Sequence, residues 1–139
     1  MQHTHNAKQT IQVDMLNPLK STLKNSFPEK EGWKLYNRYN WSSKVYDYVL
    51  QKEENNNVYR ILVEINFGDQ VTCNDFEKLT ALSDRLGAGK VQMLRTVMVV
   101  HDKINMDEVP EGIEIMEMSQ LIRKGILGLG DGFYAKLVA

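Results

Sequence analysis

The 139-residue sequence has little of several features that mark particular classes of protein. Its one cysteine, Cys73, cannot form an internal disulfide bond, which excludes a disulfide-stabilised secreted scaffold and leads us to expect a reducing, cytoplasmic location. The longest apolar run, Val91 to Val100, is interrupted by Arg95, so we expect no membrane-spanning helix. The first residues contain no apolar segment of the secretory kind, so no signal peptide is expected.

The chain also lacks a strong excess of either charge. Its formal net charge is −1, and with 42% apolar and 25% charged residues the composition is that of one folded domain. The charge is nevertheless divided, because residues 1–52 carry eight basic and four acidic side chains and the acidic excess follows them. This basic part is either an unevenly charged surface or a surface for nucleic acid. The candidate phosphate contacts are Lys20, Lys24, Lys34, Arg38 and Lys44.

Apolar periodicity and turn residues predict one domain of alternating helices and strands. Asn17 and Pro18 indicate a helix start, and the pair of Asn74 as N-cap and Glu77 at the third position indicates another. Gly87 is expected to end that second helix. The predicted elements are a helix at 17–27, strands at 33–39, 44–51 and 58–67, a helix at 75–86, strands at 95–100 and 113–116, and a helix at 119–124. We expect a flexible segment at 1–10, the domain at 11–124 and a glycine-rich extension at 125–139.

The strongest candidate site lies on the predicted hairpin. A turn centred between Asn55 and Asn56 would place Asp47 directly opposite Glu64, with their carboxylates side by side on one face. Asn66 shares that face, because side chains alternate along a strand. Two adjacent carboxylates repel each other, and Mg²⁺ bound between them would remove this cost. Such an ion can polarise a phosphoryl oxygen and supply hydroxide for phosphodiester hydrolysis.

A second interpretation of the same face needs no metal. Arg60 and Gln51 also lie on it, so it equally fits a solvated sheet surface on which Arg60 pairs with one of the acids. A shift of one residue in the register would place the two acids on opposite faces.

The order helix, three-stranded meander, helix, strand, with an acid in the second strand and a glutamate in the third, resembles the restriction-endonuclease-like superfamily, also called PD-(D/E)XK. The matching stretches are Tyr46-Asp47-Tyr-Val-Leu and Val63-Glu64-Ile65-Asn66, within a likeness that covers roughly residues 15–122. The resemblance implies an α/β (α+β) single-domain core, α-β-β-β-α-β, whose mixed central sheet is flanked by helices. It also implies Mg²⁺-dependent cleavage of DNA, with Asp47 and Glu64 as metal ligands.

The sequence departs from the family pattern at the third motif position, where Asn66 replaces the lysine that orients or activates the attacking water. Some members take this lysine from the following helix, so Lys78 is the candidate substitute, with Lys44 as a second one. The implied catalytic set is therefore Asp47, Glu64, Asn66 and Lys78. Two functions remain open: a nuclease of weak or lost activity, and a non-catalytic module that binds a protein partner or a second copy, with residues 125–139 as a docking arm.

Aromatic residues are concentrated in the first predicted strand and just after it. They are expected either to stack on bases or to belong to the core. The residues concerned are Trp33, Tyr36, Tyr39 and Trp41.

Overall fold

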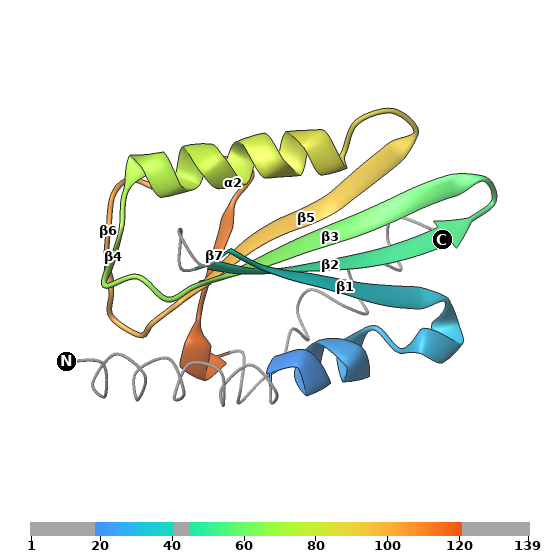
Figure 1. The fold of residues 1–139 in the computed structure, drawn as a ribbon, viewed down its shortest axis with the longest axis horizontal. Helices are drawn as coiled ribbons and strands as arrows, with labels where there is room; N and C mark the ends of the chain where they lie inside the picture. Colours follow the sequence, from blue (N-terminus) through green and yellow to red (C-terminus); the bar gives the residue numbers. More distant parts are fainter. Residues whose placement is uncertain (1–18, 41–44, 121–139) are drawn as a thin grey trace.

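The structure is a computed structural model that describes residues 19–40 and 45–120. In this part of the chain, helices lie on both sides of a mixed β-sheet (Figure 1). Residues 19–26 and 118–120 are helical. The other elements are η1 (Glu29–Glu31), β1 (Trp33–Asn40), β2 (Val45–Glu54), β3 (Asn57–Asn66), β4 (Gln70–Val71), α2 (Cys73–Leu86), β5 (Val91–Val100), β6 (Asn105–Met106) and β7 (Glu114–Glu117). None of the helices described here is long and apolar enough to cross a membrane.

The described main sheet has five strands in the order β1-β2-β3-β5-β7. β1, β2 and β3 form an antiparallel meander, whereas β5 runs parallel to β3 and β7 runs parallel to β5. The parallel step from β3 to β5 is made through α2, as parallel strands require a crossover. The predicted mixed α+β class with a mixed central sheet is confirmed.

The turn between β2 and β3 has the predicted centre. Asn55 and Asn56 occupy it with φ angles of 54° and 66°, which are left-handed conformations that asparagine tolerates better than most residues. The resulting register pairs Asp47 with Glu64 and Gln51 with Arg60. The predicted register of the hairpin is therefore confirmed.

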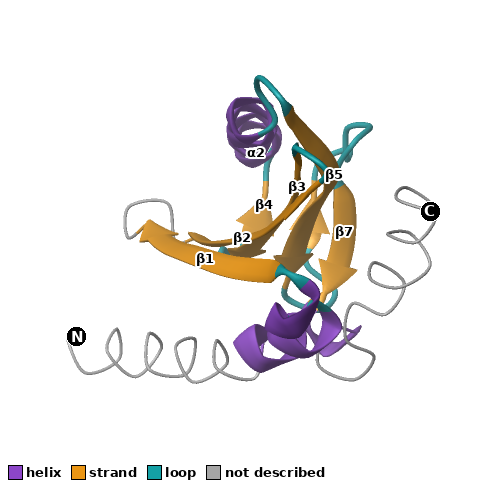
Figure 2. Ribbon diagram, turned by 90° about the vertical axis from the view of Figure 1, so that its right-hand side faces the viewer, coloured by secondary structure: helices purple, strands orange, loops and turns teal. Residues whose placement is uncertain are grey.

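Two apolar cores lie on opposite faces of the sheet. The turned view shows α2 on one side of the sheet and the first helix on the other (Figure 2). On one face, Leu19 and Leu23 of the first helix pack against inward residues of β2, β3 and β5. On the other face, Phe76 and Leu79 of α2 pack over Leu62 and its neighbours. Because side chains two residues apart on a strand share a face, the second core continues directly into Asp47, Glu64 and Asn66.

Helix α2 begins earlier than the sequence predicts. Its N-cap is Thr72 rather than Asn74, and the backbone N–H of Thr72 donates to Oδ2 of Asp75 at 2.8 Å. The observed capping box thus uses the short carboxylate Asp75 at its third position, not Glu77. At the other end the backbone N–H of Gly87 donates to the carbonyl of Ser83 at 2.9 Å, so the predicted end of the helix is confirmed.

Other differences from the predicted elements are local. β5 starts at Val91, four residues before the predicted strand, because its pairing with β3 extends past an irregularity at Arg60/Ile61. The two-residue strands β4 and β6, which pair with each other, have no alternating pattern long enough to predict. The predicted segments 1–10 and 125–139, the N-cap Asn17 and most of the last helix lie outside the described residues.

Candidate acidic site beside a cleft

Asp47 and Glu64 face each other in the middle of the sheet. They are direct partners in the antiparallel ladder of β2 and β3, both of which have a strand on either side. Asp47 is 5% exposed and Glu64 is 6% exposed. Carboxylates are rarely buried to this extent without a partner, so the pair is the most unusual polar feature of the described core.

The electrostatics of the pair depend mainly on burial. Removal from water raises the pKa of Glu64 from its ordinary value of 4.5 to about 8, and the charge of Asp47 and a side-chain hydrogen bond with Asp47 add to the rise. The charge of Asp75 raises this pKa further, while that of Lys78 lowers it. Glu64 therefore favours its protonated form at neutral pH.

The interpretation of this face as a solvated sheet surface is wrong, because α2 covers it. The predicted ion pair between Arg60 and one of the acids is also wrong. Arg60 instead donates from Nε to Oε1 of Gln51 at 2.8 Å and from Nη1 to the backbone carbonyl of Leu86 at 2.7 Å. Arg60 thus stabilises the C-terminal end of α2.

Two charged residues near the start of α2 act on the acid pair. Lys78 is exposed, yet its positive charge favours ionised Glu64, as expected of a cation near that carboxylate. Asp75 is bound to the helix N-terminus through Thr72 and was not among the predicted site residues. Its position three residues before Lys78 puts both on one side of α2, and this spacing is the signal that would have indicated it.

Asn66 occupies the face of the acids but serves the turn that follows β3. Its side chain is 3% exposed, and its Oδ1 accepts a hydrogen bond from the backbone N–H of Gly68 at 2.8 Å. A Cβ atom at Gly68 would lie 2.9 Å from the same Oδ1, so a larger residue there would displace the Asn66 amide. The third motif position is therefore held by a neutral amide that contributes no cation.

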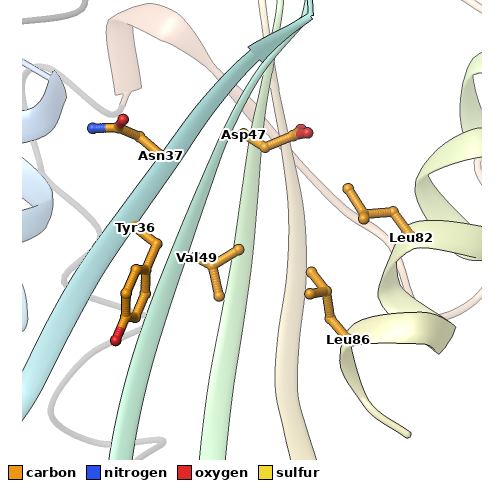
Figure 3. Close-up of a pocket in the computed structure, with 6 residues that line it drawn as sticks. All are labelled: Tyr36, Asn37, Asp47, Val49, Leu82 and Leu86. Carbon is orange, nitrogen blue, oxygen red and sulfur yellow. The ribbon is translucent and has the colours of Figure 1, made fainter.

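A cleft of about 200 Å³ opens beside Asp47, between the meander and α2 (Figure 3). In the close-up the Asp47 carboxylate points toward α2 and the Leu82 side chain points back toward the sheet. Its lining combines the carboxyl group of Asp47 with aliphatic side chains from β2 and α2. Its lining residues are Tyr36, Asn37, Asp47, Val49, Leu82 and Leu86.

The predicted phosphate contacts are divided between the two faces. Lys20 and Lys24 belong to the helix on the face opposite α2, so the structure does not bring them to the acid pair. On β1, Lys34 is paired in register with Gln51, and the Cα of Arg38 lies opposite Asp47. Lys44 lies outside the described residues.

The aromatic residues are likewise divided. Trp33 is 3% exposed and makes an edge-to-face contact with Phe27 at 5.0 Å between ring centroids, so its assignment to the core is confirmed and base stacking by this residue is excluded. Tyr36 is 50% exposed at the cleft. The side chain of Tyr39 and the whole of Trp41 lie outside the described part of the structure.

Within residues 19–40 and 45–120, no three histidine, cysteine or acidic side chains are grouped as a metal site. The pair of carboxylates is the arrangement there that suits a hard cation with waters as its remaining ligands. Comparison of the chain with protein families, curated proteins and solved structures finds no match. The functional argument therefore depends on the geometry of the site.

Proposed function

We propose that this chain binds Mg²⁺ between Asp47 and Glu64 and acts on DNA as a metal-dependent phosphodiesterase of low activity. The observation that carries the proposal is the direct pairing of two buried carboxyl groups on neighbouring central strands. Such a pair is costly when both groups are ionised, and the proton retained by Glu64 offsets that cost. A divalent cation bound between the two ionised carboxylates would offset their repulsion with two positive charges. Carboxylate oxygens are hard ligands that suit such an ion.

The surroundings of the pair support a site of this kind. Asp47 lines the cleft, so an ion held there would be reached from solvent and would meet a substrate lying in the cleft. When bound, Mg²⁺ would supply polarisation of a phosphoryl oxygen. Asp47 and Glu64 would hold the ion, and both acids would have to be ionised to do so.

Lys78 is the residue we propose for orienting the attacking water or stabilising charge on the phosphate. It is on the helix that covers the acid pair, and its charge lowers the pKa of Glu64. Asn66 cannot take this role because its amide is neutral and is bound to Gly68. We expect low activity because this lysine is an exposed residue on α2 and not one held on β3 beside the acids.

The order of the elements supports the resemblance to restriction-endonuclease-like proteins. A helix precedes the antiparallel meander, α2 follows β3, and β5 then joins the sheet. Asp47 is on the second strand of the meander and Glu64 is on the third, as the resemblance requires.

A non-catalytic module of the same fold is the second candidate. It is favoured by the neutral Asn66 and by the position of Lys20 and Lys24, which are on the face opposite the acid pair. In that case the chain would act through a protein partner or a second copy, and the cation would have a structural role.

The deciding experiment is a melting-temperature titration of the full chain with Mg²⁺ and Mn²⁺, paired with a plasmid cleavage assay. At ten times the dissociation constant, a bound ion raises the melting temperature of wild type by about 3–6 °C. Asp47→Asn and Glu64→Gln should lose this shift. Glu77→Gln, which changes an exposed acid on α2, should keep it.

Two results would each contradict a different part of the proposal. Equal shifts in all four proteins would overturn the metal site. A shift that depends on both acids, without cleavage of DNA at any metal concentration, would exclude the phosphodiesterase and favour the non-catalytic module.

A further inference from the structure

Tyr36 is unusual among the described apolar side chains because half of it remains exposed in the structure. It is on β1, directly opposite Val49 of β2, and both residues line the cleft beside Asp47. α2 supplies the other wall of the cleft through Leu82 and Leu86. The aromatic ring thus borders an open space with aliphatic side chains around it.

The acid pair and the apolar part of the cleft are neighbours along β2. Asp47 and Val49 are two residues apart on the strand, which corresponds to about 7 Å. A phosphate group at the acids would therefore leave the attached sugar and base beside Val49 and Tyr36. The cleft volume of about 200 Å³ is enough for a single planar base.

We propose that this cleft binds one unpaired base of single-stranded DNA, stacked against Tyr36, with the adjoining phosphate at the acid pair. The proposal rests on the proposed function and specifies its substrate. Val49, Leu82 and Leu86 form the apolar surroundings of the base. Stacking on an aromatic ring is the usual way in which proteins bind single strands without reading their sequence.

A double helix does not fit this arrangement. In a duplex both faces of each base are covered by its neighbours, so a base can reach an aromatic ring in a cleft only after leaving the stack. An unpaired strand presents its bases without that cost. The geometry therefore favours a single strand over a duplex.

Two exposed lysines on the elements that form the cleft suit the backbone of such a strand. Lys34 is two residues from Tyr36 on β1 and is exposed. Lys78 is four residues before Leu82 on α2 and is also exposed. These two lysines would be available to the phosphates on either side of the stacked base.

The test measures binding of a fluorescein-labelled oligothymidylate of twelve nucleotides to the full chain, in a buffer that contains Ca²⁺. Tyr36→Ala should weaken this binding by about 5- to 150-fold, the range for loss of one stacked base. Tyr36→Phe should retain it, because the ring remains. Met106→Ala removes the other large apolar side chain that is exposed among the described residues, and it should have no effect.

The same titration with the twelve-base-pair duplex formed by oligothymidylate and oligoadenylate completes the test. We expect the wild type to bind the single strand at least fivefold more tightly than the duplex. Equal binding by wild type and Tyr36→Ala, or a preference for the duplex, would overturn the proposal. The metal-dependent melting shift is measured on Tyr36→Ala as well, so that loss of the base site is distinguished from loss of the metal site.

Discussion

The carboxyl groups of Asp47 and Glu64 are hydrogen-bonded to each other across β2 and β3, and each side chain is more than nine-tenths buried. One proton is therefore part of the folded core. This gives the fold a dependence on pH that can be measured without any ligand.

Folding stability should fall as the pH rises from about 4.5 to about 8. In this interval native Glu64 keeps a proton that the unfolded chain has released, so a higher pH favours the unfolded chain. Each pH unit costs up to about 1.4 kcal/mol, so we expect a loss of about 2–4 kcal/mol between pH 5 and pH 8. Urea unfolding of the metal-free chain across this range measures it.

The matched variants for this experiment are Glu64→Gln and Glu77→Gln. The first removes the titrating group and should give a nearly flat profile across the same interval. The second removes an exposed acid on α2 and should leave the slope unchanged. Parallel slopes for wild type and Glu64→Gln would contradict the assignment of the proton to this pair.

Local sequence was sufficient to predict the position of the acid pair. Register in a hairpin is determined by its turn, and Asn55 and Asn56 tolerate the left-handed conformations that a two-residue turn needs. Helix α2 and its end at Gly87 were predicted by similar short-range signals.

Burial of the pair could not be predicted in this way. It results from the packing of α2 over the sheet, and the partner of Arg60 at Leu86 is 26 residues away in the chain. A polar face of a strand has the same pattern whether solvent or a helix covers it. Only the tertiary structure distinguishes the two, and for this reason the pairing of Arg60 with an acid was a wrong prediction.

Replacement of Arg60 tests the connection between β3 and the end of α2. Arg60→Met keeps much of the apolar stem and removes the hydrogen bonds to Gln51 and to the carbonyl of Leu86. We expect a loss of about 1.5–3 kcal/mol in the free energy of unfolding, the usual size for hydrogen bonds from a charged group. Arg85 is exposed in the last turn of α2, next to Leu86. Arg85→Met should change the free energy of unfolding by less than about 0.5 kcal/mol.

Lys78 should matter for cleavage and not for metal binding. Lys78→Met removes the cation that acts on Glu64, and we expect cleavage of single-stranded DNA to slow by about 100-fold or more. The melting shift with Mn²⁺ should persist, because both carboxyl ligands remain. Lys90→Met, an exposed lysine beyond the end of α2, is the control, and equal rates for the two variants would exclude a role for Lys78.

The last prediction concerns the third motif position. Asn66→Lys places an ammonium group on the strand beside Glu64, where the resemblance to restriction-endonuclease-like proteins expects one. We expect divalent-dependent cleavage of single-stranded DNA to increase by about 10- to 100-fold over wild type, since the cation would then be held on the strand that carries Glu64. Gel assays with labelled oligonucleotides measure this rate.

Asn66→Met is the matched control, because it loses the same hydrogen bond to Gly68 and adds no charge. Both variants should lose about 0.5–1.5 kcal/mol of stability through that bond, and Asn66→Lys also carries the cost of burying an ammonium group at a position that is 3% exposed. A difference in cleavage between the two variants, compared where both are folded, reports the added charge. If the two variants cleave equally, or if neither exceeds wild type, then the position of Asn66 is not that of a catalytic lysine, and the acid pair has a binding or structural role.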